Sequence, residues 1–166
     1  GIWGGQLQRW RNGVFNPNNP TSPTAFLPND DEPALLPFVA KMSDDLLEFA
    51  ERPREVQILD ERGKLLLAGD NKRRFFEAAW VHKYNGKYYF SYSTGDTHFI
   101  CYAVGDNPYG PFTYKGKILN PVVGWTSHHS ICEFKGKWYL FYHDSSLSKG
   151  VTHLRSIKIA EIQYDE

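Results

Sequence analysis

The stretch HKYNGKYYFSYS, residues 82–93, recurs in outline as CEFKGKWYLFYH, residues 132–143. Each copy has a strand-like run, a turn on Asn-Gly or Lys-Gly, and a second run rich in aromatic residues, so each predicts a β-hairpin. The turn residues Gly86 and Gly136 lie about 50 residues apart, which is the length that a four-stranded blade of a β-propeller requires. A β-sandwich with two similar hairpins is the alternative.

The residues around the two hairpins continue this pattern of short strands. Strands are expected in FEAAWVHKY (76–84), KYYFSYS (87–93), HFICYAV (98–104), PFTYKG (111–116), HHSICEFK (128–135), KWYLFYH (137–143) and HLRSIKIAEI (153–162). A first strand is expected in GIWGGQLQRW (1–10), and the runs EVQIL (55–59) and KLLLAG (64–69) flank a turn. We therefore expect an all-β fold built from about three propeller blades.

A segment between the first strand and residue 55 departs from the strand pattern. Its apolar residues recur at helical spacing: Leu35, Leu36, Val39, Met42, Leu46 and Phe49. Pro37 comes early in the segment, where a helix start tolerates proline. These residues predict a helical insertion near residues 33–51.

Composition and charge exclude two classes of partner. The chain of 166 residues carries 19 basic and 19 acidic residues, so its formal net charge is zero. A nucleic-acid or membrane-surface protein would carry a basic excess, and we expect neither partner. Aromatic residues make up 16% of the chain, which suits stacking on sugars and also suits a β-rich core. Cys101 and Cys132 lie in strand-like runs and are expected to be two buried free thiols rather than a disulfide.

Four segments together resemble glycoside hydrolase family 43, and most closely its β-xylosidase and α-L-arabinofuranosidase members. They are RRFFEAAWVHKYNGKYYFSYSTGDTH (73–98), NPYGPFTYKGKIL (107–119), GWTSHHSICEFKGKWYLFYH (124–143) and HLRSIKIAEI (153–162). The resemblance implies a five-bladed β-propeller that hydrolyses xylosidic or arabinofuranosidic bonds with inversion. It implies that residues 1–166 form a single partial propeller domain, the C-terminal half of such a catalytic domain.

Glu77 is a single carboxylate within an aromatic and apolar run, where an unpaired charge is costly to desolvate. The resemblance implies that Glu77 is the general acid. Such an acid needs a raised pKa, which apolar neighbours and a nearby carboxylate supply. The alternative is that Glu77 pairs with Arg73 or Arg74.

Two other residues match positions that the family places at or near its site, and two more are candidates for the wall of a sugar pocket. His128, in SHHS, is expected to help bind Ca²⁺ with waters completing the shell, or else to be a neutral core histidine. Arg155 is expected to bind substrate, or to form an ordinary surface ion pair. Trp3 would stack on a sugar face, or pack in the core, and Gln6 would line the same wall.

No segment matches the family's two aspartates, the base and the residue that tunes the acid. Inversion needs two carboxyl groups about 6.5–9.5 Å apart, so we expect the isolated chain to be inactive. The expected partners are a xylo-oligosaccharide or arabinoxylan-derived sugar, and a complementary N-terminal fragment or a second copy, bound through residues 1–10 and 155–162. The alternative is a non-catalytic, carbohydrate-binding or structural propeller fragment. The sequence does not determine the compartment.

Overall fold

The computed structural model describes residues 2–3, 28–95, 97–125 and 127–165, and all its regular elements are β-strands. The strands are β1 (Ile2–Trp3), β2 (Phe38–Val39), β3 (Arg54–Glu55), β4 (Ile58–Leu59), β5 (Glu77–Tyr84), β6 (Lys87–Ser93), β7 (Ile100–Gly105), β8 (Phe112–Leu119), β9 (His129–Phe134), β10 (Lys137–Asp144) and β11 (Ser156–Ile162). The expected all-β class is confirmed.

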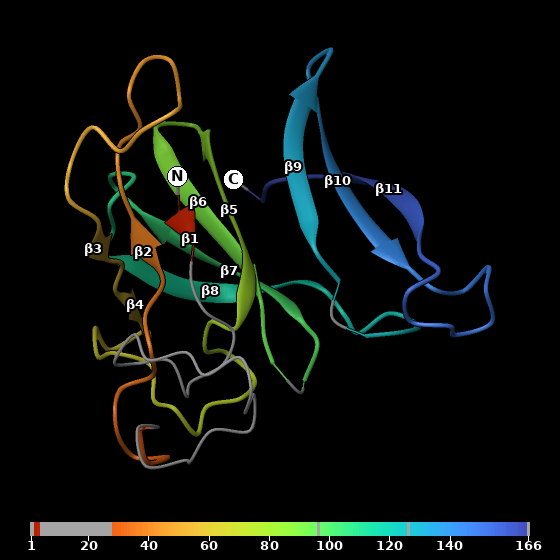
Figure 1. Cartoon of the computed structure of the whole chain (residues 1–166), viewed down its shortest axis with the longest axis horizontal. Coiled ribbons are helices and arrows are strands. Elements are labelled where there is room, and N and C mark those ends of the chain that lie inside the picture. The colour runs from red at the N-terminus through yellow and green to blue at the C-terminus, as the bar shows by residue number, and fades with distance from the viewer. Residues whose placement is uncertain (1, 4–27, 96, 126, 166) are drawn as a thin grey trace.

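The strands form three sheets that follow one another along the chain. A small sheet has the order β1-β2-β3, a five-stranded sheet has the order β4-β8-β7-β6-β5, and a three-stranded sheet has the order β11-β10-β9. Figure 1 shows the β9–β11 sheet standing to one side of the other two, next to β5. Strands β5–β8 of the five-stranded sheet form a meander of consecutive antiparallel strands, and strands β9–β11 form another, as the repeat predicted.

The two repeated hairpins have the same turn. Asn85 and Gly86 have φ values of 44° and 78°, and Lys135 and Gly136 have φ values of 53° and 78°. Positive φ at both central residues is the type I′ geometry, which suits the twist of a two-residue hairpin and favours Asn-Gly. The pairing continues directly from the turns. The two predicted hairpins are thus confirmed, although Lys135 adopts a conformation that side chains other than Asn tolerate poorly.

An earlier strand joins the edge of the five-stranded sheet. Ile58 pairs with Phe112 in parallel, so β4 lies beside β8 rather than with β1–β3. The predicted turn after β4 is present, since the Asp60 amide donates to the Lys64 carbonyl over 2.7 Å. The edge of β8 is therefore covered by a segment that lies about 50 residues earlier in the sequence.

The main core lies on one face of the five-stranded sheet. Phe90 and Tyr92 of β6 are fully buried there, and the Phe90 ring lies 5.3 Å from the ring of Phe112. Val56 and Ile58 cover these rings from the segment before the sheet. Each such side chain contributes about 1.5–3 kcal/mol when it leaves water, so this layer holds the β4 segment on the sheet.

The opposite face of the five-stranded sheet packs against the β9–β11 sheet. The indole N–H of Trp80 donates to the carbonyl of Ile131 over 3.1 Å. Farther along β5, His82 lies among aromatic rings, with its ring centroid 5.1 Å from Trp138 and 5.3 Å from Tyr89. These contacts fix the position of one sheet on the other.

Only one face of the β9–β11 sheet is covered by the five-stranded sheet. Ile131 and Leu140 point toward β5 and are buried. The other face carries Phe141 and Ile159, which are cross-strand partners. Ile159 is 61% exposed, and Ile157 on the same face is 77% exposed. The β9–β11 sheet therefore has two apolar faces. Among the described residues, the face that carries Ile157 and Ile159 has no layer covering it.

The predicted helical insertion at residues 33–51 is wrong. The segment instead turns back on itself, and the Ser43 amide donates to the Glu48 carbonyl over 2.9 Å. The side chain of Asp45 accepts from the Leu47 amide, and Leu46 has a positive φ of 62°. Local side-chain hydrogen bonds of this kind compete with helix formation. Within the described residues, no helix has the length and apolar character that crossing a membrane requires.

Both cysteines are free thiols as expected, but the expectation that both are buried is wrong for Cys132. Cys101 is buried and Cys132 is exposed. Burial raises the pKa of the Cys101 thiol to about 11, so this residue behaves as a small apolar side chain.

Candidate active site

A β-bulge determines where Glu77 points. Glu77 is opposite Ser93 and Trp80 is opposite Ser91, so two residues of β5 face only one residue of β6. Ala78 takes a positive φ of 59° within this bulge. Because Ser91 and Ser93 share a face, the bulge puts Glu77 on the face of Trp80, toward the β9–β11 sheet. A regular strand would have turned Glu77 to the opposite side.

Glu77 meets His128 on that face. The carboxylate oxygen Oε1 of Glu77 lies 3.2 Å from Nε2 of His128. The Glu77 side chain is 23% exposed and that of His128 is 52% exposed, so both are open to a ligand from solvent. The two predicted site residues are therefore brought together.

The arginines next to Glu77 have partners of their own. Arg73 binds Asp70 through Nε over 2.6 Å and Glu61 through Nη1 over 3.2 Å. Arg74 donates from Nη2 to the side chain of Asn71 over 2.8 Å. The carboxylate contact that the structure gives Glu77 is the one with His128.

Arg155 is connected to His128 through His143, which is not among the predicted site residues. The backbone amide of His128 donates to Nε2 of His143 over 3.0 Å, and Nη1 of Arg155 lies 3.3 Å from the same nitrogen. The rings of His128 and His143 are stacked with centroids 6.2 Å apart. His143 thus connects two of the predicted residues.

The sequence repeat carried a signal for His143. His143 ends the second hairpin motif at the position where Ser93 ends the first. Ser93 is the partner of Glu77, and His143 lies beside His128 in the corresponding place of the next sheet. Comparing the ends of the two motifs would have identified the pair.

The second histidine of the SHHS motif, His129, is half-buried. Nε2 of His129 lies 2.6 Å from the hydroxyl of Ser91, between the two sheets. Burial lowers the pKa of His129 to about 3, so its ring is neutral. Burial also lowers the pKa of His143, with a further contribution from the guanidinium of Arg155. Of the two adjacent histidines, His129 supports the packing and His128 faces the site.

The side chains at this place do not form a calcium site by themselves. Calcium takes six to eight oxygen ligands, and His128 with Glu77 provides one imidazole and one carboxylate. No group of three His, Cys, Asp or Glu residues suited to a metal occurs in the described part of the chain.

Two predicted residues are not placed as side chains. The backbone of Trp3 pairs with Phe38 at the edge of the small sheet, but its side chain is outside the description. Gln6 lies outside the described residues. Their expected roles at the pocket wall remain predictions.

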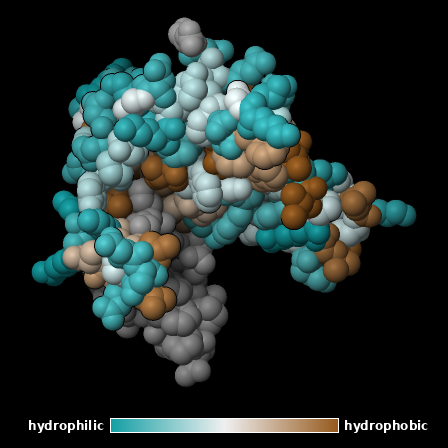
Figure 2. Space-filling view, turned by 90° about the horizontal axis from the view of Figure 1, so that it is seen from above, coloured by the Kyte–Doolittle hydropathy of each residue, from teal (hydrophilic) through white to brown (hydrophobic). Residues whose placement is uncertain are grey.

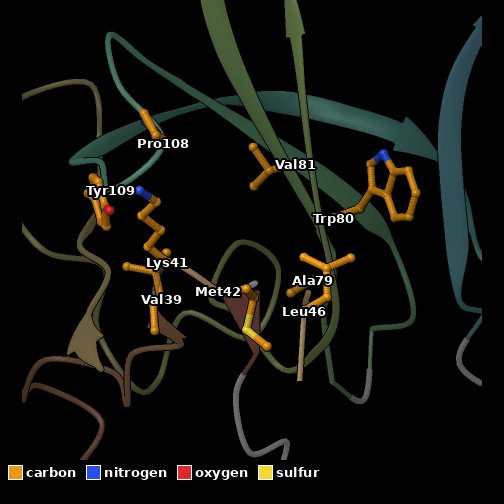
Figure 3. A pocket seen from close by; sticks show the side chains of 10 residues that line it. Val39, Lys41, Met42, Leu46, Ala79, Trp80, Val81, Pro108 and Tyr109 are labelled. Carbon is orange, nitrogen blue, oxygen red and sulfur yellow. The ribbon is translucent and has the colours of Figure 1, made fainter. Parts of the chain in front are cut away.

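An apolar pocket lies between the β2 segment and β5, close to Glu77 along the strand. Its volume is about 550 Å³. Figure 3 shows Trp80 turned toward the neighbouring sheet, while Met42 and Tyr109 lie across from β5. Its lining residues are Val39, Ala40, Lys41, Met42, Leu46, Ala79, Trp80, Val81, Pro108 and Tyr109.

Comparison with known proteins gives a consistent result. The model of glycosyl hydrolases family 43 matches residues 38–166. A xylosidase/arabinosidase of Bacteroides ovatus is 66% identical over 99% of this chain and 49% of its own length. A β-xylosidase of Xylanibacter ruminicola is 61% identical over 99% of this chain and 50% of its own length. The chain therefore spans about half the length of the curated relatives it matches.

A solved structure is similar over the same extent. It is a GH43 β-xylosidase/α-arabinofuranosidase from a compost microbial metagenome, in complex with xylotriose and in a calcium-free form. The identity is 60% and the TM-score is 0.89, over 99% of this chain and 50% of that one.

Proposed function

The chain belongs to glycosyl hydrolase family 43, and from this premise we propose that it is the acid-bearing half of an inverting β-xylosidase or α-L-arabinofuranosidase. The observation that carries the proposal is the bulge that aims Glu77 at His128 across two sheets. Bulges next to active sites commonly re-aim a side chain in this way.

Glu77 acts as the general acid in this proposal. Its carboxyl group donates a proton to the glycosidic oxygen as the bond to the anomeric carbon breaks. A second carboxylate removes a proton from the attacking water on the opposite face of the sugar. That base comes from the half of the relatives that this chain does not match.

The substrate we propose is a xylo-oligosaccharide or an arabinoxylan-derived sugar, because a similar enzyme has been solved with xylotriose. Arg155 donates hydrogen bonds to a sugar hydroxyl from its position beside His143. Trp3 and Gln6 contribute to the wall of the sugar pocket.

A divalent cation near His128 is a second element of the proposal. The similar structure in a calcium-free form implies that calcium is relevant to that protein. Since the described side chains supply few ligands, water would have to fill most of the shell. Chelation by EDTA should lower the melting temperature of the complete enzyme, and calcium should restore it. An equal EDTA effect in a His128→Gln variant would remove His128 from the site.

Residues 1–166 form a single partial propeller domain in this proposal, with a partner on the exposed face of the β9–β11 sheet. The partner is a complementary N-terminal half or a second copy of the chain. Large apolar faces rarely stay open to water on soluble proteins.

The test is to assay the chain alone and together with the N-terminal half of the Bacteroides ovatus relative. We expect no hydrolysis of nitrophenyl xyloside or arabinofuranoside by the chain alone, and hydrolysis by the pair. Glu77→Gln in the pair should remove most activity on natural oligosaccharides, whereas Glu55→Gln, an exposed carboxylate on β3, should not. Hydrolysis by the chain alone would overturn the proposal, and sugar binding without hydrolysis by the pair would favour a non-catalytic fragment.

A further inference from the structure

The nitrogen Nε2 of His143 faces two groups that can only donate. The His128 backbone N–H lies 3.0 Å away, and Nη1 of Arg155 lies 3.3 Å away. A backbone amide and a guanidinium have no acceptor to offer, so Nε2 must carry its lone pair. The proton of the neutral ring is then on Nδ1. The geometry fixes this tautomer without reference to any substrate.

The backbone of His143 is hydrogen-bonded to the side chain of Ser127. The hydroxyl of Ser127 donates to the His143 carbonyl over 2.8 Å and lies 3.2 Å from its amide. Ser127 is buried, and its own carbonyl accepts from the hydroxyl of Ser93. Ser93 is the cross-strand partner of Glu77. A continuous set of contacts therefore connects the Glu77 strand to the histidine in the neighbouring sheet.

The two donors on His143 flank the candidate site. The backbone amide of His128 donates to His143, and Nε2 of the His128 ring lies 3.2 Å from Oε1 of Glu77. Arg155 contacts His143 through Nη1, and its Nε also donates to the carbonyl of Thr152 over 2.8 Å. Two contacts on one planar group restrict its rotation, so the guanidinium has a defined direction.

We propose that His143 is a positioning residue, whose Nε2 lone pair holds the His128 backbone and the Arg155 guanidinium in place around Glu77. The proposal rests on the proposed function of Glu77 and adds a residue that does not touch the reacting atoms. The gain is pre-organisation, because misplacing a group near a reacting bond by about 1 Å can cost about 100-fold in rate.

The competing explanation is that His143 only fills space. A glutamine separates the two ideas, because its Oε1 can lie near the position of Nε2 and accept from the same donors. An alanine removes the acceptor. A space-filling role predicts losses that follow the melting temperature, whereas a positioning role predicts rescue by glutamine.

The first measurement uses the chain as it is. Long-range ¹H–¹⁵N NMR should show Nε2 of His143 unprotonated and Nδ1 protonated, and His143→Ala should shift the His128 amide signal. The same alanine substitution at His153, an exposed histidine, should leave that signal unchanged. A proton on Nε2 in the folded chain would overturn the positioning role whatever the enzyme does.

The second measurement uses the chain paired with the complementary half. His143→Ala should lower kcat/KM for xylotriose about 10- to 100-fold, and His143→Gln should restore most of it at a similar melting temperature. Equal losses in both variants would overturn the proposal. Inactivity of the unsubstituted pair would instead count against the proposed function, and the NMR measurement would still decide the role of His143.

Discussion

Glu77 and His128 lie 3.2 Å apart, although Glu77 begins a strand of the five-stranded sheet and His128 leads into the next sheet. The contact depends on the bulge at Ala78 and on the packing of Trp80 on β9. The contact places a carboxylate and an imidazole side by side where both side chains are partly exposed to solvent.

The role of Glu77 as general acid can be tested by comparing substrates whose leaving groups differ in their need for protonation. Glu77→Gln in the paired enzyme keeps the side-chain size and removes the acid. Substrates with poor leaving groups should lose about 100- to 10,000-fold in kcat, because they need protonation as the bond breaks. Activated aryl xylosides should lose much less. Equal losses on both substrate types would contradict the role, and the exposed Glu55→Gln serves as the matched control.

Because of the bulge, replacing Ala78 or Ala79 by glycine should change the free energy of unfolding differently. Ala78 has a φ of 59°, where a side chain is strained, so Ala78→Gly should raise the free energy of unfolding or leave it unchanged. Ala79 does not have a positive φ, so Ala79→Gly should lower the free energy of unfolding by about 0.5–1 kcal/mol. Urea unfolding measures both. Equal destabilisation by the two variants would mean that the bulge does not exist in solution.

Half-buried, neutral histidines should make the chain sensitive to acid. Burial lowers the pKa of His129 to about 3 and that of His82 to about 4, against 6.5 when unfolded. The unfolded chain therefore binds more protons below about pH 6.5, and stability present above that pH should fall steadily toward about pH 4. Urea midpoints measured across this range test the slope.

A non-titrating residue at position 129 should flatten that slope. His129→Gln removes the proton-binding group while leaving an oxygen for Ser91. His153→Gln, at an exposed position, should keep the slope of the original chain. A slope that His129→Gln leaves unaltered would show that other groups cause the acid sensitivity.

The open face of the β9–β11 sheet should mediate association. Figure 2 shows apolar residues gathered on this protruding sheet, and Ile157 and Ile159 are among its most exposed side chains. We expect the isolated chain to self-associate, and the double change Ile157→Lys with Ile159→Lys to reduce this association by sedimentation velocity. Leu147→Lys is the control, since Leu147 is 78% exposed in the loop after β10. A monomeric original chain would contradict the prediction.

The hairpins were predictable because their information is local. Asn85-Gly86 and Lys135-Gly136 fix the turn, and alternating aromatics fix which side of each strand faces inward. The strand limits around both turns therefore agree with the structure to within a few residues. Repetition of the motif added the prediction that the second sheet copies the first.

The helical prediction failed because a periodic pattern does not include turn chemistry. Leu46 and Phe49 fit a helix, but Ser43 and Asp45 bind neighbouring amides and turn the chain instead. The position of His143 could have been found from the ends of the two repeated motifs, but its contacts could not. Its partners His128 and Arg155 lie just before β9 and β11, and the strand pattern does not specify how those segments run beside the end of β10.

The parallel pairing of β4 with β8 affects what a protease would do to the molecule. The exposed turn around Gly63 separates β4 from the rest of its sheet along the chain, and Phe112 also donates its amide to the Gln57 carbonyl. A single cut in that turn would leave two polypeptides that remain bound through buried contacts of Val56 and Ile58. The nicked protein would migrate as one species on a native gel and as two bands after denaturation.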